Sequence, residues 1–498
     1  MSGPFALLAK HGRGAAITRD RSAAELLRDA AAVAAELSPA RRPGEQILVL
    51  CHDRYRFACA LVAALSRGLV VALPPSTQPE MIRALRQHED VRTVLHDQDD
   101  VAARLGIPVA DLRADPMGPA GTFSLARAGT VLTGHDGAPT LAGADDVALV
   151  LHTSGTTARP KIVPLTHRNV CASARHIAGS LALTPADLCL NVMPLFHIHG
   201  LVAALLSSLG VGAAVACSPG FNALQFFTWL KDLRPSWYTA VPTMHQAILT
   251  RLRSHADAAR AAKLRFIRSS SASLPPQVML ELEAAFDCPV IEAYGMTEAS
   301  HQMASNALPP GKRKPGAVGL PAGPKIAIMD EAGHFLPQGT IGEVVIQGPN
   351  VTAGYDNNPD ANLKAFADGW FRTGDQGRFD EDGYLFLTGR LKEIINRGGE
   401  KISPIEVDTI LMDHPAVEQV VTFAIPHPML GEDVGAVVVL RAGMEATERE
   451  LRDFVGKHAA DFKVPRKVVF VTEIPKGATG KLQRIGLAAK LGLAEAKA

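Results

Sequence analysis

Five short apolar runs, each of which leads into a polar loop, constrain the fold more than any other feature of the sequence. The runs begin at Val147, Cys189, Trp237, Leu264 and Val290. Helical spacing of apolar residues follows the first of them, over 167–183. Strands that alternate with helices form largely parallel sheets, and ligands usually bind beyond the carboxyl ends of those strands. The sequence therefore predicts an α/β fold with a ligand site at these loops.

The loop that follows the first run is suited to phosphate. Ser154, Thr156 and Thr157 can donate hydroxyl hydrogen bonds. Gly155 lets backbone N–H groups come close, and Lys161 supplies a compact positive charge. This is not a Walker loop, because the order G-x-x-x-x-G-K-[ST] is absent. A solvated turn of the same composition is the alternative interpretation.

Length, charge and cysteine spacing narrow the class of protein. A chain of 498 residues is too long for one compact core and predicts two or three domains. The formal net charge of +1 gives no general field to attract nucleic acid or anionic membrane, so neither is an expected partner. The 6 cysteines include no C-x-x-C pair, which argues against a disulfide framework and a zinc site. Since neither a signal peptide nor a peroxisomal tripeptide is found, we expect a cytoplasmic protein.

One uncharged apolar segment, residues 200–221, approaches the length needed to cross a membrane. Gly210, Gly212 and Pro219 interrupt it. We therefore predict a buried helix followed by a buried strand, with a membrane span as the minority interpretation.

The first third of the chain shows the same alternation of helices and strands. Predicted helices cover 23–37, 55–65 and 81–88, and predicted strands cover 46–51, 69–73 and 91–95. Residues 98–145 predict irregular chain with a few short strands. This part is the least informative about function.

Two later motifs carry residues suited to a nucleotide. A predicted strand ends on Tyr294, whose ring can stack on a base, and it is followed by Thr297 and Glu298. The threonine hydroxyl can donate a hydrogen bond to a phosphate oxygen, and the glutamate carboxylate is a hard ligand for Mg²⁺. In the second motif, Asp375 is predicted on a turn, where it can accept both hydroxyls of a ribose. A turn-capping aspartate is the alternative there.

In the last third of the chain, the predicted secondary structure changes from alternating helices and strands to a β-rich segment. Alternating residues from Gly342 predict a small β subdomain, and a compact α+β module follows. Two capping boxes are predicted in this module, at 403–406 and 447–450. A glycine-rich turn near the end places Lys481 on a mobile loop.

These motifs, in this order over residues 150–484, resemble those of an acyl-CoA synthetase of the adenylate-forming superfamily, and the sequence is most similar to oxalate–CoA ligases. Two positions depart from the usual phosphate loop: Ala158 replaces glycine, and Ile162 follows the lysine. The resemblance implies a large N-terminal domain, residues 1–389, with parallel-sheet α/β subdomains and a small β subdomain. It also implies a small mobile α+β domain, residues 390–498, that rotates about a hinge near Lys392.

The resemblance implies a two-step reaction that uses ATP, Mg²⁺ and CoA. A carboxylate displaces pyrophosphate to form acyl-AMP, and CoA then displaces AMP. Lys481 and Glu298, a catalytic cation and a metal ligand, serve the first step together with Thr297. The implied nucleotide and CoA contacts are Thr153, Thr157, Ser271, Ala272, Ala293, Tyr294, Asp375, Arg390, Lys392, Gly398 and Gly399.

The expected substrate is a small, doubly anionic carboxylic acid, with oxalate first. His197, His245 and His301 flank motifs that the resemblance places around the acyl group, and a protonated histidine would bind a second carboxylate. Arg268 is a further candidate. The alternatives are an adenylation enzyme that activates an aryl or fatty acid for CoA or a carrier protein, a luciferase-type oxidase, and a non-enzymatic nucleotide-binding protein. A monomer or homodimer is expected.

Overall fold

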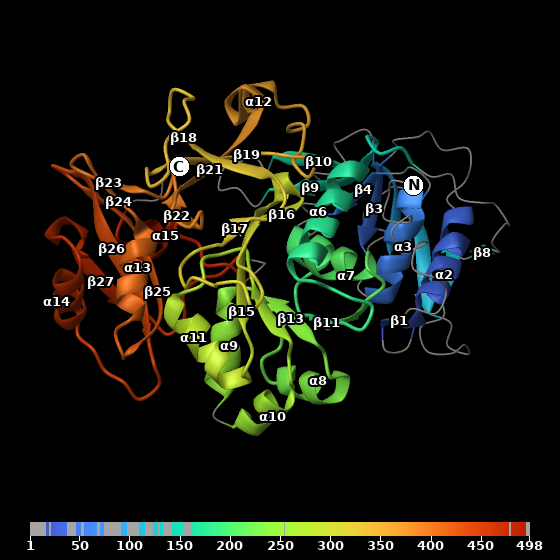
Figure 1. The fold of residues 1–498 in the computed structure, drawn as a ribbon, viewed down its shortest axis with the longest axis horizontal. Helices are drawn as coiled ribbons and strands as arrows, with labels where there is room; N and C mark the ends of the chain where they lie inside the picture. The colour runs from blue at the N-terminus through green and yellow to red at the C-terminus, as the bar shows by residue number, and fades with distance from the viewer. Residues whose placement is uncertain are drawn as a thin grey trace.

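We describe the fold from a computed structural model. The structure describes residues 142–153, 161–252, 254–477 and 480–494, and before them the helices and strands named below. Two large sheets, a smaller sheet and a C-terminal module follow one another along the chain. The second large sheet lies in the middle, with the first sheet on one side and the C-terminal module on the other (Figure 1).

The first sheet is built from the N-terminal part of the chain. Its strands are β3 (Gln46–Leu50), β4 (Val70–Leu73), β5 (Val91–His96), β6 (Val109–Ala114), β7 (Phe123–Arg127), β8 (Thr130–Leu132), β9 (Val147–His152) and β10 (Ile162–Thr166). Their order is β10-β9-β4-β3-β5-β6-β7-β8, in which the strands from β9 to β6 pair in parallel and the edges are antiparallel. A separate pair is formed by β1 (Ala16–Thr18) and β2 (Arg21–Ser22).

Two helices in this part of the chain match the helices predicted over 23–37 and 55–65. They are α2 (Ala23–Glu36) and α3 (Arg54–Ser66). Helix α3 is buried from Phe57 to Leu65, which explains why its sequence is apolar on all sides. The predicted strands here are confirmed, and the predicted helix over 81–88 lies outside the described residues.

The second sheet contains most of the predicted strand-and-loop units. Its strands are β11 (Leu188–Asn191), β12 (Ala214–Cys217), β13 (Trp237–Ala240), β14 (Phe266–Ser269), β15 (Val290–Met296), β16 (His301–Ser305) and β17 (Leu320–Pro321). Their order is β12-β11-β13-β14-β15-β16-β17, parallel from β12 to β15 and antiparallel beyond. The helices are α6 (His167–Ser180), η1 (His199–Leu206), α7 (Ser207–Leu209), α8 (Phe226–Leu233), α9 (Pro242–Leu252), α10 (Ala256–Ala261) and α11 (Pro276–Phe286).

The apolar segment 200–221 forms the predicted buried helix, and the strand that follows is only partly buried, with Val215 as its buried residue. Helices η1 and α7 are buried throughout and lead into β12. Across the part of the chain that the structure describes, no helix combines the length and the apolar character that a membrane crossing requires.

Strand β15 is longer than predicted. It continues past Tyr294 to Met296, because β16 pairs with it in antiparallel fashion, and Thr297 then begins a short 3₁₀ turn, η2 (Thr297–Ala299). The expectation that the strand ends at the tyrosine is therefore wrong. A side chain at Gly295 would place its Cβ 2.0 Å from the His301 carbonyl oxygen, so glycine is needed for this close pairing.

The smaller sheet confirms the predicted β subdomain. It contains β18 (Lys325–Met329), β19 (Gly342–Gln347), β20 (Phe366–Ala367), β21 (Trp370–Phe379) and β22 (Leu385–Arg390), with helix α12 (Pro359–Ala365) beside it. Asp375 lies within β21 and pairs with Arg390 of β22, so the predicted turn is wrong. A local T-G-D pattern resembles a turn, but pairing with a later strand keeps the chain extended through it.

The C-terminal module is an α+β unit. Its strands are β23 (Ile395–Arg397), β24 (Glu400–Ile402), β25 (Val417–His427), β26 (Gly431–Leu440) and β27 (Lys467–Phe470), and its helices are α13 (Pro404–Met412), α14 (Glu448–His458), η3 (Asp461–Lys463) and α15 (Leu487–Lys490). Thr447 and Glu450 form the predicted capping box of α14. At α13, Ser403 caps the helix but Glu406 does not cap in return, since its carboxylate binds Lys463 at 2.6 Å. The predicted box at 403–406 is therefore only half formed.

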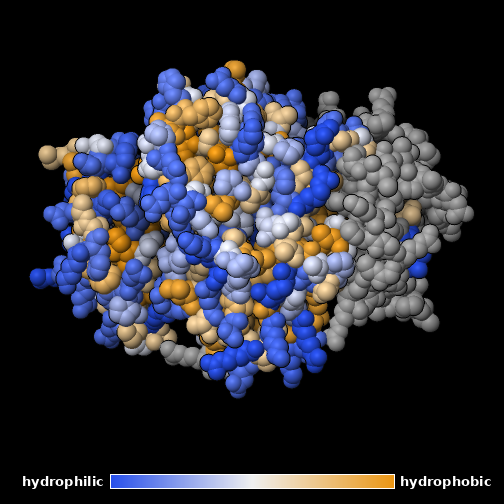
Figure 2. Space-filling model, in the orientation of Figure 1, coloured by the Kyte–Doolittle hydropathy of each residue, from blue (hydrophilic) through white to orange (hydrophobic). Residues whose placement is uncertain are grey.

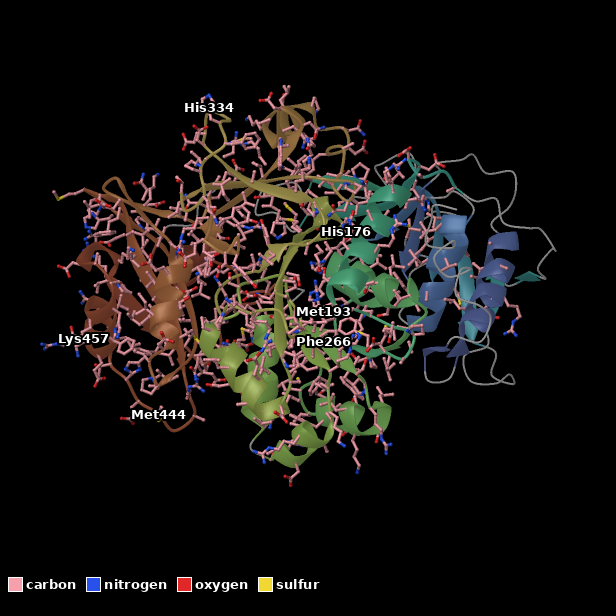
Figure 3. All side chains as sticks on the ribbon, in the orientation of Figure 1. His176, Met193, Phe266, His334, Met444 and Lys457 are labelled. Atoms are coloured by element: carbon pink, nitrogen blue, oxygen red, sulfur yellow. The ribbon has the colours of Figure 1, made fainter. Side chains whose placement is uncertain are left out.

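The interior and the surface differ as expected for a globular protein. Met193 and Phe266 are buried near the middle of the molecule, whereas His334 and Lys457 lie at its periphery (Figure 3). On the face shown in Figure 2, the described residues are mostly hydrophilic, with hydrophobic residues in patches between them. Sheets of mixed pairing with helices, followed by a smaller α+β module, confirm the predicted fold class.

Candidate active site

A cavity of about 220 Å³ lies where the second sheet, the smaller sheet and the C-terminal module meet. The segments after β13 and β14 and the second half of β15 form one wall, and β21, β22 and α13 contribute to the others. The predicted site residues that line it are Ser271, Ala272, Ala293, Tyr294, Asp375, Arg390 and Lys481. Residues more than 200 positions apart in sequence are thus brought together at the carboxyl ends of parallel strands, as the sequence predicted.

A charged hydrogen-bonded group forms the floor of the cavity. The Tyr294 hydroxyl donates to Asp375 Oδ2 at 2.5 Å, and Arg390 Nε lies 3.2 Å from Asp375 Oδ1. Burial and the neighbouring carboxylate raise the pKa of Tyr294, so its hydroxyl remains a donor. The buried aspartate is therefore fixed in one orientation, with a tyrosine ring beside it.

Lys481 reaches the cavity from the C-terminal loop. The preceding Gly480 has φ of +79°, and its carbonyl accepts a hydrogen bond from the Thr243 hydroxyl at 2.7 Å. This contact docks the loop on the start of α9. Burial, together with the positive charge of Arg390, lowers the pKa of Lys481 to about 8. The lysine is therefore still largely protonated at pH 7.

The pKa of Lys481 predicts an alkaline limit on the use of ATP. If the protonated lysine stabilises the reacting phosphates, kcat/KM for ATP should fall above about pH 8, because the free protein then loses the charge. We expect Lys481→Arg to move this limit upward, since a guanidinium stays protonated. A profile of pyrophosphate release that stays flat to pH 10 would contradict the assignment.

Three charged residues around Lys481 were not predicted from the sequence. Arg484 binds Asp408 Oδ2 at 2.5 Å through Nη2 and lies 3.5 Å from Glu393 Oε2 through Nε. All three line the cavity. They are separated by up to 91 positions, and no local motif joins them. This cluster ties the end of the chain to α13 and to the segment after β22.

Glu298 and Lys161 lie close together beside this cavity. Glu298 is buried, which raises the pKa of its carboxyl, although Lys161 and a hydrogen bond from the Tyr355 hydroxyl oppose that rise. Lys161 Nζ sits 4.2 Å from the centre of the Tyr355 ring. Thr153 closes the base of the phosphate-type loop, because its N–H donates to the Lys161 carbonyl at 3.0 Å. The other loop residues with predicted phosphate contacts, 154–157, lie outside the described residues.

The surroundings of Glu298 fit the way proteins hold Mg²⁺ with a nucleotide. One carboxylate oxygen accepts the Tyr355 hydrogen bond at 2.9 Å. Among the described residues no cluster of three or more His, Cys, Asp or Glu side chains is arranged to hold a metal. A single carboxylate completed by phosphate oxygens and water is the usual arrangement for Mg²⁺, whereas a site made of protein alone would need more ligands.

The three predicted histidines are not among the residues that line the cavity. His197 Nδ1 accepts a hydrogen bond from the His199 N–H at 3.3 Å, and His245 Nδ1 is 3.2 Å from the Tyr238 hydroxyl. Neither ring nitrogen of buried His301 has a hydrogen-bond partner among the described residues. Burial lowers the pKa of His197 to about 4 and that of His245 to about 3. They are neutral at pH 7, so the expectation of a protonated histidine is wrong for the free protein.

Arg268 is the charged residue of this region. It lies on β14, is completely buried, and its Nε has no hydrogen-bond partner within the part of the chain that the structure describes. Its other contacts are long, 3.5 Å to His199 Nε2 and 3.4 Å to Gln302 Oε1. No carboxylate of the described residues pairs with it, and burial lowers its pKa only to about 10. His199 connects it to the cavity, since His199 Nδ1 is 3.0 Å from the hydroxyl of Ser271.

The remaining predicted residues do not line the cavity. Lys392 is exposed in the turn after β22, and Gly398 and Gly399 are exposed in the β23–β24 hairpin. Gly398 and Gly399 adopt φ of +60° and +102°, which favours glycine at both positions. Thr297 begins η2, next to Glu298.

Comparisons with known proteins agree with this geometry. The chain matches the family model of AMP-binding enzymes over residues 8–356 and that of the AMP-binding enzyme C-terminal domain over residues 406–481. The chain therefore belongs to the AMP-binding enzyme family, and the predicted resemblance is confirmed.

Individual CoA ligases are among the proteins most similar to this chain. The chain is 53% identical over 343 residues to an oxalate–CoA ligase of Arabidopsis thaliana, which covers 68% of this chain and 66% of that protein. It is 36% identical to a sulfoacetate–CoA ligase of Cupriavidus necator, with 89% and 87% covered. ATP-bound MatB from Rhodopseudomonas palustris superposes with a TM-score of 0.86 at 28% identity over 97% of each chain. The chain thus spans less than two thirds of the length of the Arabidopsis relative.

Proposed function

We propose that this chain is an AMP-forming carboxylate–CoA ligase that uses ATP, Mg²⁺ and CoA and prefers a small dicarboxylate, with oxalate first. In the first step a carboxylate oxygen attacks the α-phosphorus of ATP, and the bond to pyrophosphate breaks. In the second step the CoA sulfur attacks the acyl carbon, and AMP leaves. The names of the relatives and the composition of the cavity support this proposal.

The roles follow from the contacts. Asp375 and Arg390 would hold the ribose, and Tyr294 would contact the base. Lys481 would neutralise the phosphate at which the carboxylate attacks, because it is the cation docked at the cavity by the terminal loop. Glu298 would hold Mg²⁺, which supplies positive charge to the departing pyrophosphate when it is bound.

The preference for a dicarboxylate rests on one observation, the buried and unpaired guanidinium of Arg268. A buried charge without a counter-charge is costly, so a site that keeps one is expected to bind an anion there. The distal carboxylate of oxalate would supply the missing partner. A fatty or aryl acid would leave the guanidinium and the ring of His301 unpaired, which disfavours the alternative substrates.

We further propose that the small domain, residues 390–498, rotates about Lys392 between the two steps. Lys481 lines the cavity, whereas the Gly398–Gly399 hairpin does not. A single orientation of the small domain therefore does not bring both Lys481 and the hairpin to the cavity. The cytoplasmic location and the monomeric or dimeric state remain predictions.

Replacing Lys392 by proline tests this rotation. Lys392 is exposed, and among the described residues its N–H donates no backbone hydrogen bond, so proline restricts φ without breaking such a bond. We expect acyl-AMP to form and accumulate while thioester formation slows, as measured by single-turnover analysis of both products. Unchanged turnover with CoA would exclude Lys392 as the hinge.

The experiment for the proposed activity is pyrophosphate release with a panel of acids, measured with and without CoA. We expect release with oxalate and a CoA thioester as the final product. Transfer to a holo-carrier protein in preference to CoA would support the alternative acceptor, and release with none of the acids would refute the proposal.

A further inference from the structure

The segment between β19 and α12 joins two parts of the site that are far apart in sequence. The Thr352 N–H donates to the Glu298 carbonyl at 2.7 Å, and its hydroxyl donates to the Pro164 carbonyl at 2.7 Å. The Asp356 N–H donates to the Ile162 carbonyl at 3.0 Å. The turn that carries Glu298 and the strand that leaves the phosphate-type loop are therefore fastened to one short stretch, residues 352–356.

Tyr355 continues this connection with its side chain. Its hydroxyl donates to Glu298 Oε1 at 2.9 Å, and Lys161 Nζ lies 4.2 Å from its ring centre. The ring is buried against the edge of Phe371, with centroids 6.3 Å apart. One aromatic side chain thus contacts the candidate metal ligand through its hydroxyl and a candidate phosphate-binding cation through its ring face.

The backbone of Tyr355 is itself held firmly. Asn362 of α12 accepts from the Tyr355 N–H at 2.7 Å and donates to its carbonyl at 2.8 Å. The preceding Gly354 has φ of +147°, and a Cβ there would lie 2.9 Å from the same asparagine. The position and direction of the tyrosine ring are therefore set by the fold around α12 and not by the nucleotide.

We propose that Tyr355 is a positioning residue for adenylate formation that keeps Glu298 and Lys161 adjacent but unpaired. Among the described residues, Lys161 and Glu298 do not form an ion pair, although each influences the pKa of the other. The tyrosine hydroxyl donates a hydrogen bond to one carboxylate oxygen of Glu298, and its ring face lies against the Lys161 ammonium. A ring face attracts a cation without neutralising its charge. Both charges are thereby kept available for the metal and the phosphates.

This inference rests on the proposed function for the identity of the metal and the nucleotide. The effect of Tyr355 on its two neighbours does not depend on the reaction, because without this side chain Lys161 and Glu298 are free to pair with each other. Such a pair would compete with Mg²⁺ for Glu298, because a salt bridge uses the same oxygens that would bind the metal.

The test measures Mg²⁺-dependent binding of ATP by calorimetry, with no acid and no CoA present. In Tyr355→Phe the ring is kept and the hydroxyl is lost, and we expect the Mg²⁺ concentration for half-maximal ATP binding to rise about 10-fold. Tyr355→Leu should raise it further, because the ring face is lost too. Thioester formation from pre-made acyl-AMP, which involves no departing pyrophosphate, should be unchanged in both variants.

Tyr384→Phe is the matched control. Tyr384 is buried, donates its hydroxyl to the Lys312 carbonyl at 2.8 Å, and has Lys314 Nζ 4.7 Å from its ring centre, but it does not line the cavity. Its Mg²⁺ dependence should match that of the wild type. An unchanged dependence in Tyr355→Phe, or an equal shift in Tyr384→Phe, would overturn the proposal. Since no acid is present, either result is distinct from failure of the ligase proposal, which wild-type pyrophosphate release decides.

Discussion

Replacing Lys481 by alanine is expected to slow acyl-adenylate formation by roughly two to four orders of magnitude. The lysine is the cation that the docked C-terminal loop places at the cavity, and the first step gathers several anionic oxygens there. Its loss should leave the conversion of pre-made acyl-AMP to thioester largely intact, because that step no longer involves the departing pyrophosphate. Single-turnover measurement of each half-reaction provides the comparison.

Lys476→Ala is a matched control for this result. Lys476 belongs to the same terminal loop, but its ammonium binds Glu473 at 3.2 Å and does not line the cavity. We expect both half-reactions to keep near wild-type rates in that variant. If Lys481→Ala slows both half-reactions equally, the lysine does not serve adenylation specifically.

Replacing Arg268 by methionine is expected to lower kcat/KM for oxalate by about 100- to 1,000-fold, since a buried charged partner of the substrate is lost. The value for acetate, which has no second carboxylate, should change far less. The substrate-free protein should unfold at no lower temperature than the wild type, because methionine removes an unpaired buried charge and retains most of the volume. Thioester assays and thermal unfolding measure the two effects.

Arg265→Met separates a substrate effect from a structural one. Arg265 lies just before the same strand, but its guanidinium pairs with Asp187 at 3.1 Å. That variant should lose stability, since it breaks an ion pair, yet keep the wild-type ratio of oxalate to acetate activity. An equal loss of both activities in Arg268→Met would remove the arginine from the substrate site.

Local patterns predicted much of the fold. The strands of the two large sheets were visible because strands buried on both faces carry mostly apolar residues, as in β9, which is apolar from Val147 to Leu151. The rule for parallel sheets predicts a ligand site at the loops beyond their ends, and Ser271 and Ala272 of that region do line the cavity. Asp375, Arg390 and Lys481 also line it, but they lie outside the parallel strands and were predicted from the family resemblance.

Properties that depend on tertiary contacts could not be predicted. Asp375 was placed on a turn because its partner, Arg390, belongs to a later strand that the T-G-D pattern does not reveal. The histidines were expected to be protonated because their burial, which lowers the pKa, arises only in the packed protein. Tyr355 was missed as a contact of Glu298, since the two residues are 57 positions apart.

The proposed activity of this chain is the formation of a CoA thioester of a small dicarboxylic acid. Its most direct test compares kcat/KM for thioester formation with oxalate, malonate, acetate, octanoate and 4-hydroxybenzoate at equal concentrations of ATP, Mg²⁺ and CoA. The unpaired guanidinium of Arg268 predicts the highest value for oxalate. A higher value for octanoate or 4-hydroxybenzoate would contradict the dicarboxylate assignment.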